Sequence, residues 1–154
     1  MLTDEETQEI KHELTLYPHK QAACVEALKT VQRRRGWVSD ENIQDIAAIL
    51  GMTPEELDGV ATFYNLIYRR PVGRNVILMC DSVSCWIMGY DRMRTRAKQT
   101  LGVAPGETTA DGRFTLLPAP CLGTCDKAPA MMVGDDLHTN LAPETLDAVL
   151  EPYK

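Results

Sequence analysis

The chain has 154 residues, 44% of them hydrophobic, and a formal net charge of −6. This size and composition suit one ordinary domain or two small ones, each with a packed core. The acidic balance argues against a nucleic-acid partner, because phosphate binding needs a basic surface. No apolar run approaches the roughly 20 residues of a membrane-spanning helix, so we expect no direct insertion into a membrane.

The beginning of the chain is polar and acidic, and its first residues read MLTDEETQEIKHE. A secretory or transit signal has the opposite character, so we expect a cytoplasmic protein. In that compartment, paired cysteines bind metals or carry out redox chemistry more often than they form structural disulfides.

Helix-start signals dominate residues 1–70, which show no strand-like alternation. Thr3 and Glu6 form a capping-box pattern, in which each side chain accepts a hydrogen bond from the other residue's backbone N–H. Pro18 is expected to open a second helix, which stops near Gly36.

Two further helices are expected in this part of the chain. Ser39 would cap a third helix, which ends at Gly51. Residues 53–56 supply a cap, a proline at the first helical position and a glutamate three residues after the cap, and they predict a fourth helix that runs through Ile67. We therefore expect a small helical bundle that serves as a docking or scaffolding element and has no chemistry of its own.

Residues 69–74 separate the helical part of the chain from a part with a different pattern. An apolar run at 76–79 ends at Cys80 and predicts a buried strand. A helix is expected over 89–101. After a turn signal, residues 113–117 predict a second strand.

The last part of the sequence predicts a hairpin and a closing helix. Residues 130–133 and 137–139 flank a turn signal at 134–136, and Pro143 opens a helix that includes Leu150. The resulting order, β-α-β-β-β-α, describes a compact α/β sheet covered by helices and matches the core order of a thioredoxin-like fold. The pattern by itself is also compatible with other α/β arrangements.

Four of the five cysteines form two close pairs. Four residues lie between Cys80 and Cys85, and three lie between Cys121 and Cys125. Each pair follows a predicted strand, and loops at strand ends can bring distant segments together. Gly123 would let the second loop turn its N–H groups toward the sulfurs. The layout predicts four thiolates that converge on one inorganic centre.

Three kinds of site compete for these cysteines. Iron–sulfur clusters take four cysteine thiolates, and a four-residue gap between ligands occurs in plant-type [2Fe–2S] ferredoxins. A structural zinc site also takes four cysteines, and the spacing does not exclude it. A dithiol redox site favours two cysteines separated by two residues, a spacing that this sequence lacks. An iron–sulfur cluster is therefore the leading prediction.

The remaining candidate residues give weaker signals. Cys24 lies in the predicted second helix without a partner and is expected to be a small buried residue. Lys127 and Arg113 could offset the negative charge of a cluster, although solvated surface positions explain them equally well. Asp81 and Asp126 each follow a proposed ligand directly, and they would act in the opposite direction if they lay near the sulfurs.

Several segments together resemble one family, the [2Fe–2S] E subunit of bacterial NADH–quinone oxidoreductase, which is respiratory complex I. The resemblance covers nearly the whole chain and involves no departure at a ligand position. The segments that carry it are residues 59–64 (GVATFY), 70–74 (RPVGR), 80–85 (CDSVSC), 108–118 (TTADGRFTLLP) and 121–129 (CLGTCDKAP), with 36–39 (GWVS) and 141–144 (LAPE).

The resemblance implies a division into a helical bundle at residues 1–70 and a thioredoxin-like [2Fe–2S] domain at residues 71–154. It also implies one [2Fe–2S] cluster as the cofactor. The ligands that it implies are Cys80, Cys85, Cys121 and Cys125.

In that family, the subunit packs against the subunit that binds flavin and oxidises NADH, and its cluster accepts one electron from the reduced flavin. The resemblance thus implies this partner and the other peripheral-arm subunits, at the cytoplasmic side of the inner membrane through the assembled complex. The chain itself would hold no NADH, FMN or quinone, and its sequence has no Gly-x-Gly-x-x-Gly fingerprint.

Two alternative functions remain at the level of sequence. The first is the equivalent [2Fe–2S] subunit of an NAD-linked formate dehydrogenase or hydrogenase, which shares the fold and the motif. The second, from a different class, is a zinc-stabilised interaction module with no redox role. Iron and sulfide analysis separates the zinc module from the others, and the co-purified subunits separate the two redox complexes.

Overall fold

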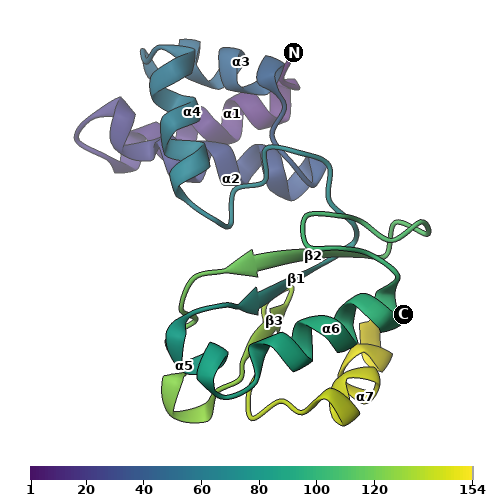
Figure 1. The fold of residues 1–154 in the computed structure, drawn as a ribbon. Helices are drawn as coiled ribbons and strands as arrows, with labels where there is room; N and C mark the ends of the chain where they lie inside the picture. Colours follow the sequence, from purple (N-terminus) through teal and green to yellow (C-terminus); the bar gives the residue numbers. More distant parts are fainter. Residues whose placement is uncertain (154) are drawn as a thin grey trace. The chain divides into compact units, whose positions relative to one another are not determined.

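A computed structural model describes residues 1–153, and the chain divides into two compact units, Met1–Pro71 and Val72–Lys154. The first, here called the helical unit, contains only helices, and the second, the α/β unit, contains the sheet (Figure 1). Each unit has a hydrophobic core of its own. Across the described residues, no helix is long and apolar enough to cross a membrane.

The helical unit has four α-helices, and short 3-10 turns follow the first and precede the second. Three of the four begin with a capping box, which the sequence predicted at α1 and α4, whereas at α3 it predicted the Ser39 cap but not the pairing of Ser39 with Asn42. At α1, for example, the Thr3 N–H donates to Glu6 Oε2 at 2.8 Å, and the Glu6 N–H donates to Thr3 Oγ1 at 3.1 Å. The α-helices are α1 (Asp4–Glu13), α2 (Cys24–Arg35), α3 (Asp40–Leu50) and α4 (Pro54–Phe63).

Two helix boundaries differ from the prediction. Pro18 does not open α2, because His19 has an extended backbone and interrupts the helical path before the 3-10 turn Lys20–Ala23. The fourth helix stops at Phe63 instead of running through Ile67, because Tyr64 is extended. Ile67 still reaches the core, through a turn in which its N–H donates to the Tyr64 carbonyl.

One core and several ion pairs stabilise the helical unit. A fully buried Leu, Ile or Val side chain contributes roughly 1.5–3 kcal/mol. Between α1 and α2, Arg35 Nη2 lies 2.6 Å from Glu6 Oε2, and its hydrogen bonds are the main reason that the pKa of Glu6 falls to about 2. The core residues with no exposed surface include Ile10, Ala23, Ala27, Leu28, Val31, Val38, Ile46, Leu50, Leu57 and Ala61.

The α/β unit contains a four-stranded sheet in the order β2-β1-β3-β4. Strands β1 and β2 are parallel, whereas β1–β3 and β3–β4 are antiparallel, so the predicted hairpin is confirmed. The elements are β1 (Asn75–Cys80), α5 (Val83–Ile87), α6 (Tyr90–Leu101), β2 (Phe114–Ala119), β3 (Met131–Val133), β4 (Asp136–His138) and α7 (Leu146–Leu150).

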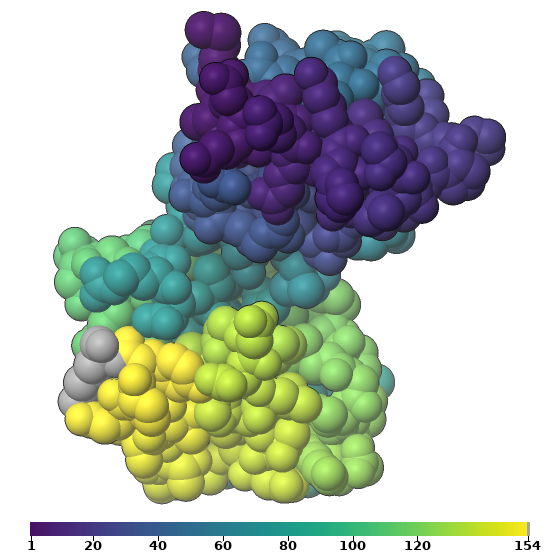
Figure 2. All heavy atoms as spheres, turned by 180° about the vertical axis from the view of Figure 1, so that it is seen from behind, coloured from purple at the N-terminus to yellow at the C-terminus, as the bar shows by residue number. Residues whose placement is uncertain are grey.

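One face of this sheet packs against α6 and α7, which lie side by side (Figure 1). The closing helix begins with the 3-10 turn Pro143–Thr145 before α7. After α7 the chain runs back beside residues 131–140 (Figure 2), where Tyr153 Oη donates to Asp136 Oδ2 at 2.7 Å. The core between sheet and helices is formed by Ile77, Met79, Phe114, Leu116, Met131, Val133, Met93, Ala97, Leu146 and Leu150.

Candidate metal centre

The two cysteine pairs begin at the same edge of the sheet. In the parallel register of β1 and β2, Cys80 lies opposite Ala119, and each is the last residue of its strand. The N–H of Asp81 donates to the Ala119 carbonyl at 3.0 Å, and the N–H of Cys80 donates to the Ala130 carbonyl at 3.1 Å. The first of these bonds holds the starts of the two loops next to each other, as the sequence predicted, and the second joins the end of β1 to the segment before β3.

The first pair is buried. A short helix that the sequence did not predict, α5, follows β1 after two residues and carries Cys85 on its inner side. Cys80 and Cys85 are each only 3% exposed. They pack with Ala128 and Ala130, and Leu122 from the second loop lies against this cluster. The loop after β2 lies beside α5 in Figure 1.

The second pair is exposed and compact. The Sγ atoms of Cys121 and Cys125 lie 3.3 Å apart. Gly123 between them has a φ of +82°, a left-handed conformation that glycine adopts without strain. Its N–H donates to Cys121 Sγ at 3.4 Å, so the predicted role of this glycine is confirmed.

Electrostatic interactions link the two pairs into one group. The pKa of the Cys85 thiol is raised to about 11, mainly by burial, with smaller contributions from the contact with Cys80 and from charge on Cys125. Contact with Cys121 raises the pKa of Cys125, to which Cys80 also contributes, whereas the N–H of Gly123 lowers the pKa of Cys121. Cys125 therefore lies near both thiols of the first pair, so the two pairs form one site.

The donor set fits an iron–sulfur cluster. All five cysteines are free thiols, and four of them gather where the two loops meet. Four cysteine sulfurs suit a [2Fe–2S] centre, and they also suit zinc. Within residues 1–153, no three or more His, Cys, Asp or Glu side chains are grouped as they would be around a single metal ion. Metal binding at such thiols releases their protons.

Comparison with known proteins identifies the family and the cofactor. Residues 10–154 match the family described as "Thioredoxin-like [2Fe-2S] ferredoxin". The chain belongs to this family. A [2Fe–2S] cluster is the cofactor of this thioredoxin-like ferredoxin, and its fold class is the predicted one.

Two relatives of this thioredoxin-like ferredoxin match over nearly its full length. The NADH-quinone oxidoreductase E subunit of Escherichia coli strain K12 is 50% identical over 153 residues, which are 99% of this chain and 92% of the relative. The protein of the same name from Pseudomonas aeruginosa is 48% identical with the same coverage. The predicted resemblance to the E-subunit family is therefore confirmed.

Solved structures show the same fold. A chain of an NAD⁺-reducing [NiFe]-hydrogenase in its H₂-reduced state superposes with a TM-score of 0.70 at 23% identity. The match covers 85% of this chain and 22% of the hydrogenase chain. At this identity the likeness concerns the fold of the thioredoxin-like ferredoxin alone.

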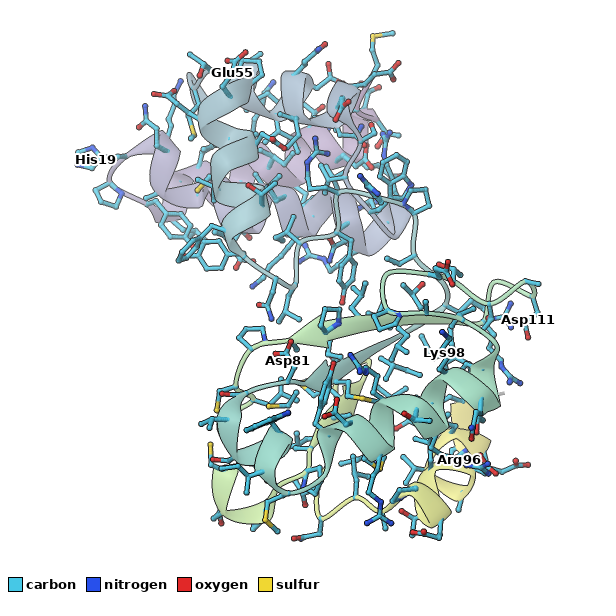
Figure 3. All side chains as sticks on the ribbon, in the orientation of Figure 1. His19, Glu55, Asp81, Arg96, Lys98 and Asp111 are labelled. Atoms are coloured by element: carbon cyan, nitrogen blue, oxygen red, sulfur yellow. The ribbon has the colours of Figure 1, made fainter. Side chains whose placement is uncertain are left out.

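The weaker candidates fall at different distances from the thiols. Arg113 precedes β2, whereas Cys121 follows it, so a strand of about 20 Å separates it from the site. Its guanidinium lies over the Phe114 ring, and a role in offsetting cluster charge is not supported. Lys127, Asp126 and Asp81 are exposed beside the site, and Asp81 is labelled in Figure 3 at the start of the loop after β1.

Cys24 lies outside the site. It begins α2 in the helical unit, is half-buried and packs against that unit's core, close to the buried position that the sequence predicted. Sequence reasoning missed α5 altogether. The sequence signal for α5 is Ser82 followed by the uncharged residues 83–88. This run is too short to show a helical period.

Proposed function

We propose that this chain is the [2Fe–2S] electron-transfer E subunit of an NADH–quinone oxidoreductase. The observation that carries the proposal is the meeting of two cysteine pairs at one sheet edge in a chain half identical to subunits of that name. We assign the cluster ligands to Cys80, Cys85, Cys121 and Cys125. When bound, the cluster takes up and releases single electrons.

The residues around the thiols suit such a centre. Buried Cys80 and Cys85 would screen one side of it from water, while exposed Cys121 and Cys125 leave the other side near the surface. The N–H of Gly123 points at Cys121 Sγ and would stabilise negative charge on that sulfur. Hydrogen bonds to sulfur and solvent exposure are two of the quantities that set a cluster's reduction potential.

The partner in this proposal is the subunit that binds flavin and NADH in the same complex. NADH gives up two electrons together, whereas a [2Fe–2S] centre takes one, so the flavin must divide the pair between acceptors. This chain would exchange one electron with that flavin and would contact other peripheral-arm subunits. It would lie at the cytoplasmic side of the inner membrane through the assembled complex.

The near full-length identity favours complex I over a hydrogenase or formate dehydrogenase. Relatives named as E subunits match 99% of this chain at about half identity, whereas the hydrogenase match is limited to the fold. Purification of the tagged chain from its own membranes decides between them. Complex I subunits should co-purify, and co-purified hydrogenase or formate dehydrogenase subunits would contradict the assignment.

The electron exchange can be tested with purified components. The cluster-loaded chain is mixed anaerobically with the purified flavin- and NADH-binding subunit, and electron paramagnetic resonance follows cluster reduction after NADH is added. The cluster should become reduced only when the flavin subunit is present. Reduction by NADH of the isolated chain, or no reduction in the mixture, would overturn the proposed electron exchange.

A further inference from the structure

The helix that carries Cys85 exposes an apolar surface on its outer side. Cys85 is buried, whereas four large apolar neighbours within the same six residues are open to solvent. This surface, here called the α5 patch, consists of Val83 (64% exposed), Trp86 (59%), Ile87 (70%) and Met88 (60%).

The α5 patch differs from ordinary surface hydrophobicity. Single exposed apolar residues are common, but a contiguous group of them marks an interaction site. None of the four packs against a core of the α/β unit. Among the described residues of this unit, Leu137 on β4 is the other large apolar side chain with comparable exposure, and it stands alone. Trp and Met are also enriched at the centres of protein interfaces.

We propose that the α5 patch is the surface on which the flavin-bearing subunit docks for electron exchange. This inference rests on the proposed function, because it assumes that Cys85 is a cluster ligand. A partner seated on α5 would be separated from the cluster by little more than the thickness of this one short helix. Electron transfer slows steeply with distance, so a redox partner must cover a surface next to the cluster.

The charges beside the patch indicate the chemistry of the partner surface. Asp81 and Asp126 each follow a proposed ligand, are exposed, and form no ion pair within residues 1–153. Lys127, next to Asp126, carries the opposite, positive charge. A reduced cluster would add negative charge to the same region. The complementary surface is therefore an apolar pocket for Trp86 and Ile87 with basic side chains on its rim.

This surface adds to the docking element predicted from sequence. The amphipathic helices of residues 1–70 are expected, on the sequence alone, to supply the contact with partners. In this proposal, the α/β unit has a docking surface of its own. That surface lies on α5, the helix that carries the proposed ligand Cys85.

Matched variants test the proposal in the cluster-loaded full-length chain. Ile87→Glu and Trp86→Ser alter the patch, and Leu137→Glu changes an exposed apolar residue on β4. Binding to the immobilised flavin-bearing subunit is measured at near-physiological salt. We expect Kd to rise about tenfold or more for each patch variant, as for central interface residues, and to change less than about twofold for Leu137→Glu.

A second measurement uses only the wild-type chain, so its result cannot be caused by misfolding of a variant. Hydroxyl-radical footprinting of the wild-type chain should show protection of Trp86 and Met88 when the flavin subunit is added, with Leu137 unchanged. Unchanged Kd in both patch variants, or no protection of Trp86 and Met88 in a complex that has formed, would refute docking at α5. The same holds if sedimentation shows that the patch joins two copies of this chain.

The outcomes separate this inference from the proposed function. If wild-type chain that contains the cluster fails to bind the flavin subunit, the proposed function fails, and docking at α5 falls with it. If wild type and patch variants bind equally well, only the docking surface is wrong. Iron content and the reduced-cluster spectrum of each variant, which should match the wild type, show that the site itself is intact.

Discussion

In the helical unit, three helices begin with capping boxes, and their apolar sides pack into a single core. In the α/β unit, α5 begins at Ser82 without a side-chain cap, and its apolar side chains face solvent. The three helices that begin with capping boxes, α1, α3 and α4, carry no candidate ligand. Four helices, α2, α5, α6 and α7, begin without a side-chain cap, and one of them, α5, carries Cys85.

The contrast between the two units indicates where the chemistry of the molecule is located. A sequence specifies its fold when local propensity, capping and burial all agree, and departures from that agreement concentrate at functional sites. The helical unit shows such agreement at three of its four helix starts. The four candidate thiols lie in the α/β unit, so chemistry is expected there. Exposed apolar side chains occur in both units, with Phe63 at the end of α4 and Trp86 and Ile87 in α5.

The largest expected effect comes from the cysteines themselves. Replacing Cys80, Cys85, Cys121 or Cys125 by serine should abolish or strongly destabilise the cluster, because serine is a harder donor that ionises less readily than a thiol. Iron per chain should fall from about two toward zero. Cys24→Ser is the matched control in the helical unit and should keep the cluster. Loss in the control, with free replacement of any of the four, would disprove the ligand set.

The next largest effect is expected for a fragment that contains only the α/β unit. The sheet, its helical cover and all four proposed ligands lie within Val72–Lys154. A fragment that begins at Pro71 should therefore still assemble a cluster, although exposed apolar surface is expected to lower its solubility. The visible absorption spectrum and iron content measure this. A folded fragment that cannot bind iron would mean that the helical unit contributes to the site.

The helical unit should be the more acid-sensitive of the two through Glu6. Its side chain is 1% exposed and bonded to Arg35, and its pKa in the folded state is about 2 rather than 4.5. Because the folded-state pKa is lowered, the stabilisation is present above pH 4.5 and is lost as the pH falls from about 4.5 to about 2. A shift of this size corresponds to about 3 kcal/mol.

Trp37 reports on this unit, and Trp86→Phe removes the second tryptophan of the chain. In that background, urea unfolding followed by tryptophan fluorescence should show stability falling across this pH window. Glu6→Gln should lower stability at pH 7 and flatten the pH dependence. An equally steep acid dependence in Glu6→Gln would assign it to other carboxylates, among them Glu9, whose pKa is also lowered by Arg34 and Arg33.

A pair of glycines gives the smallest expected effects, with opposite signs in the two units. At Gly73, an added Cβ would lie 2.9 Å from the Gly112 carbonyl oxygen, and the Gly73 N–H donates to Thr115 Oγ1 at 2.6 Å. Gly73→Ala should therefore destabilise the α/β unit by about 1–3 kcal/mol. At Gly59 in α4 nothing lies within 4 Å, so Gly59→Ala should stabilise by about 0.5–1 kcal/mol.

Thermal and urea unfolding of the two alanine variants measure these changes. Destabilisation by Gly59→Ala would indicate a partner of this helix surface that the free chain does not show. An unchanged stability in Gly73→Ala would mean that the backbone around Gly112 yields without cost.

Much of the fold could be predicted because it depends on local signals. Capping pairs such as Thr53 with Glu56, the apolar run before Cys80 and the turn at Gly134 act over a few neighbouring residues. These signals located most elements correctly. The two helix boundaries that were wrong, at Pro18 and Ile67, depend on extended residues nearby that interrupt a favourable pattern.

The sequence was sufficient to predict which residues form the site. It was not sufficient to predict which side chains around the site are exposed. Cysteine spacing identified two pairs, and the strand ends indicated where they would meet. The parallel pairing that brings Cys80 beside Ala119 is a long-range contact, which no local pattern contains. The outward direction of Trp86 and Ile87 likewise depends on which side of α5 the buried Cys85 occupies.

Quantitative spectroscopy of the wild-type chain tests most directly whether the four thiols hold one [2Fe–2S] cluster. The full-length protein is prepared anaerobically, its iron, zinc and acid-labile sulfide are determined, and electron paramagnetic resonance is recorded after reduction. We predict about two irons and two sulfides per chain, and one spin-half centre per chain in the reduced protein. Stoichiometric zinc without iron, or about four irons per chain, would contradict the assignment.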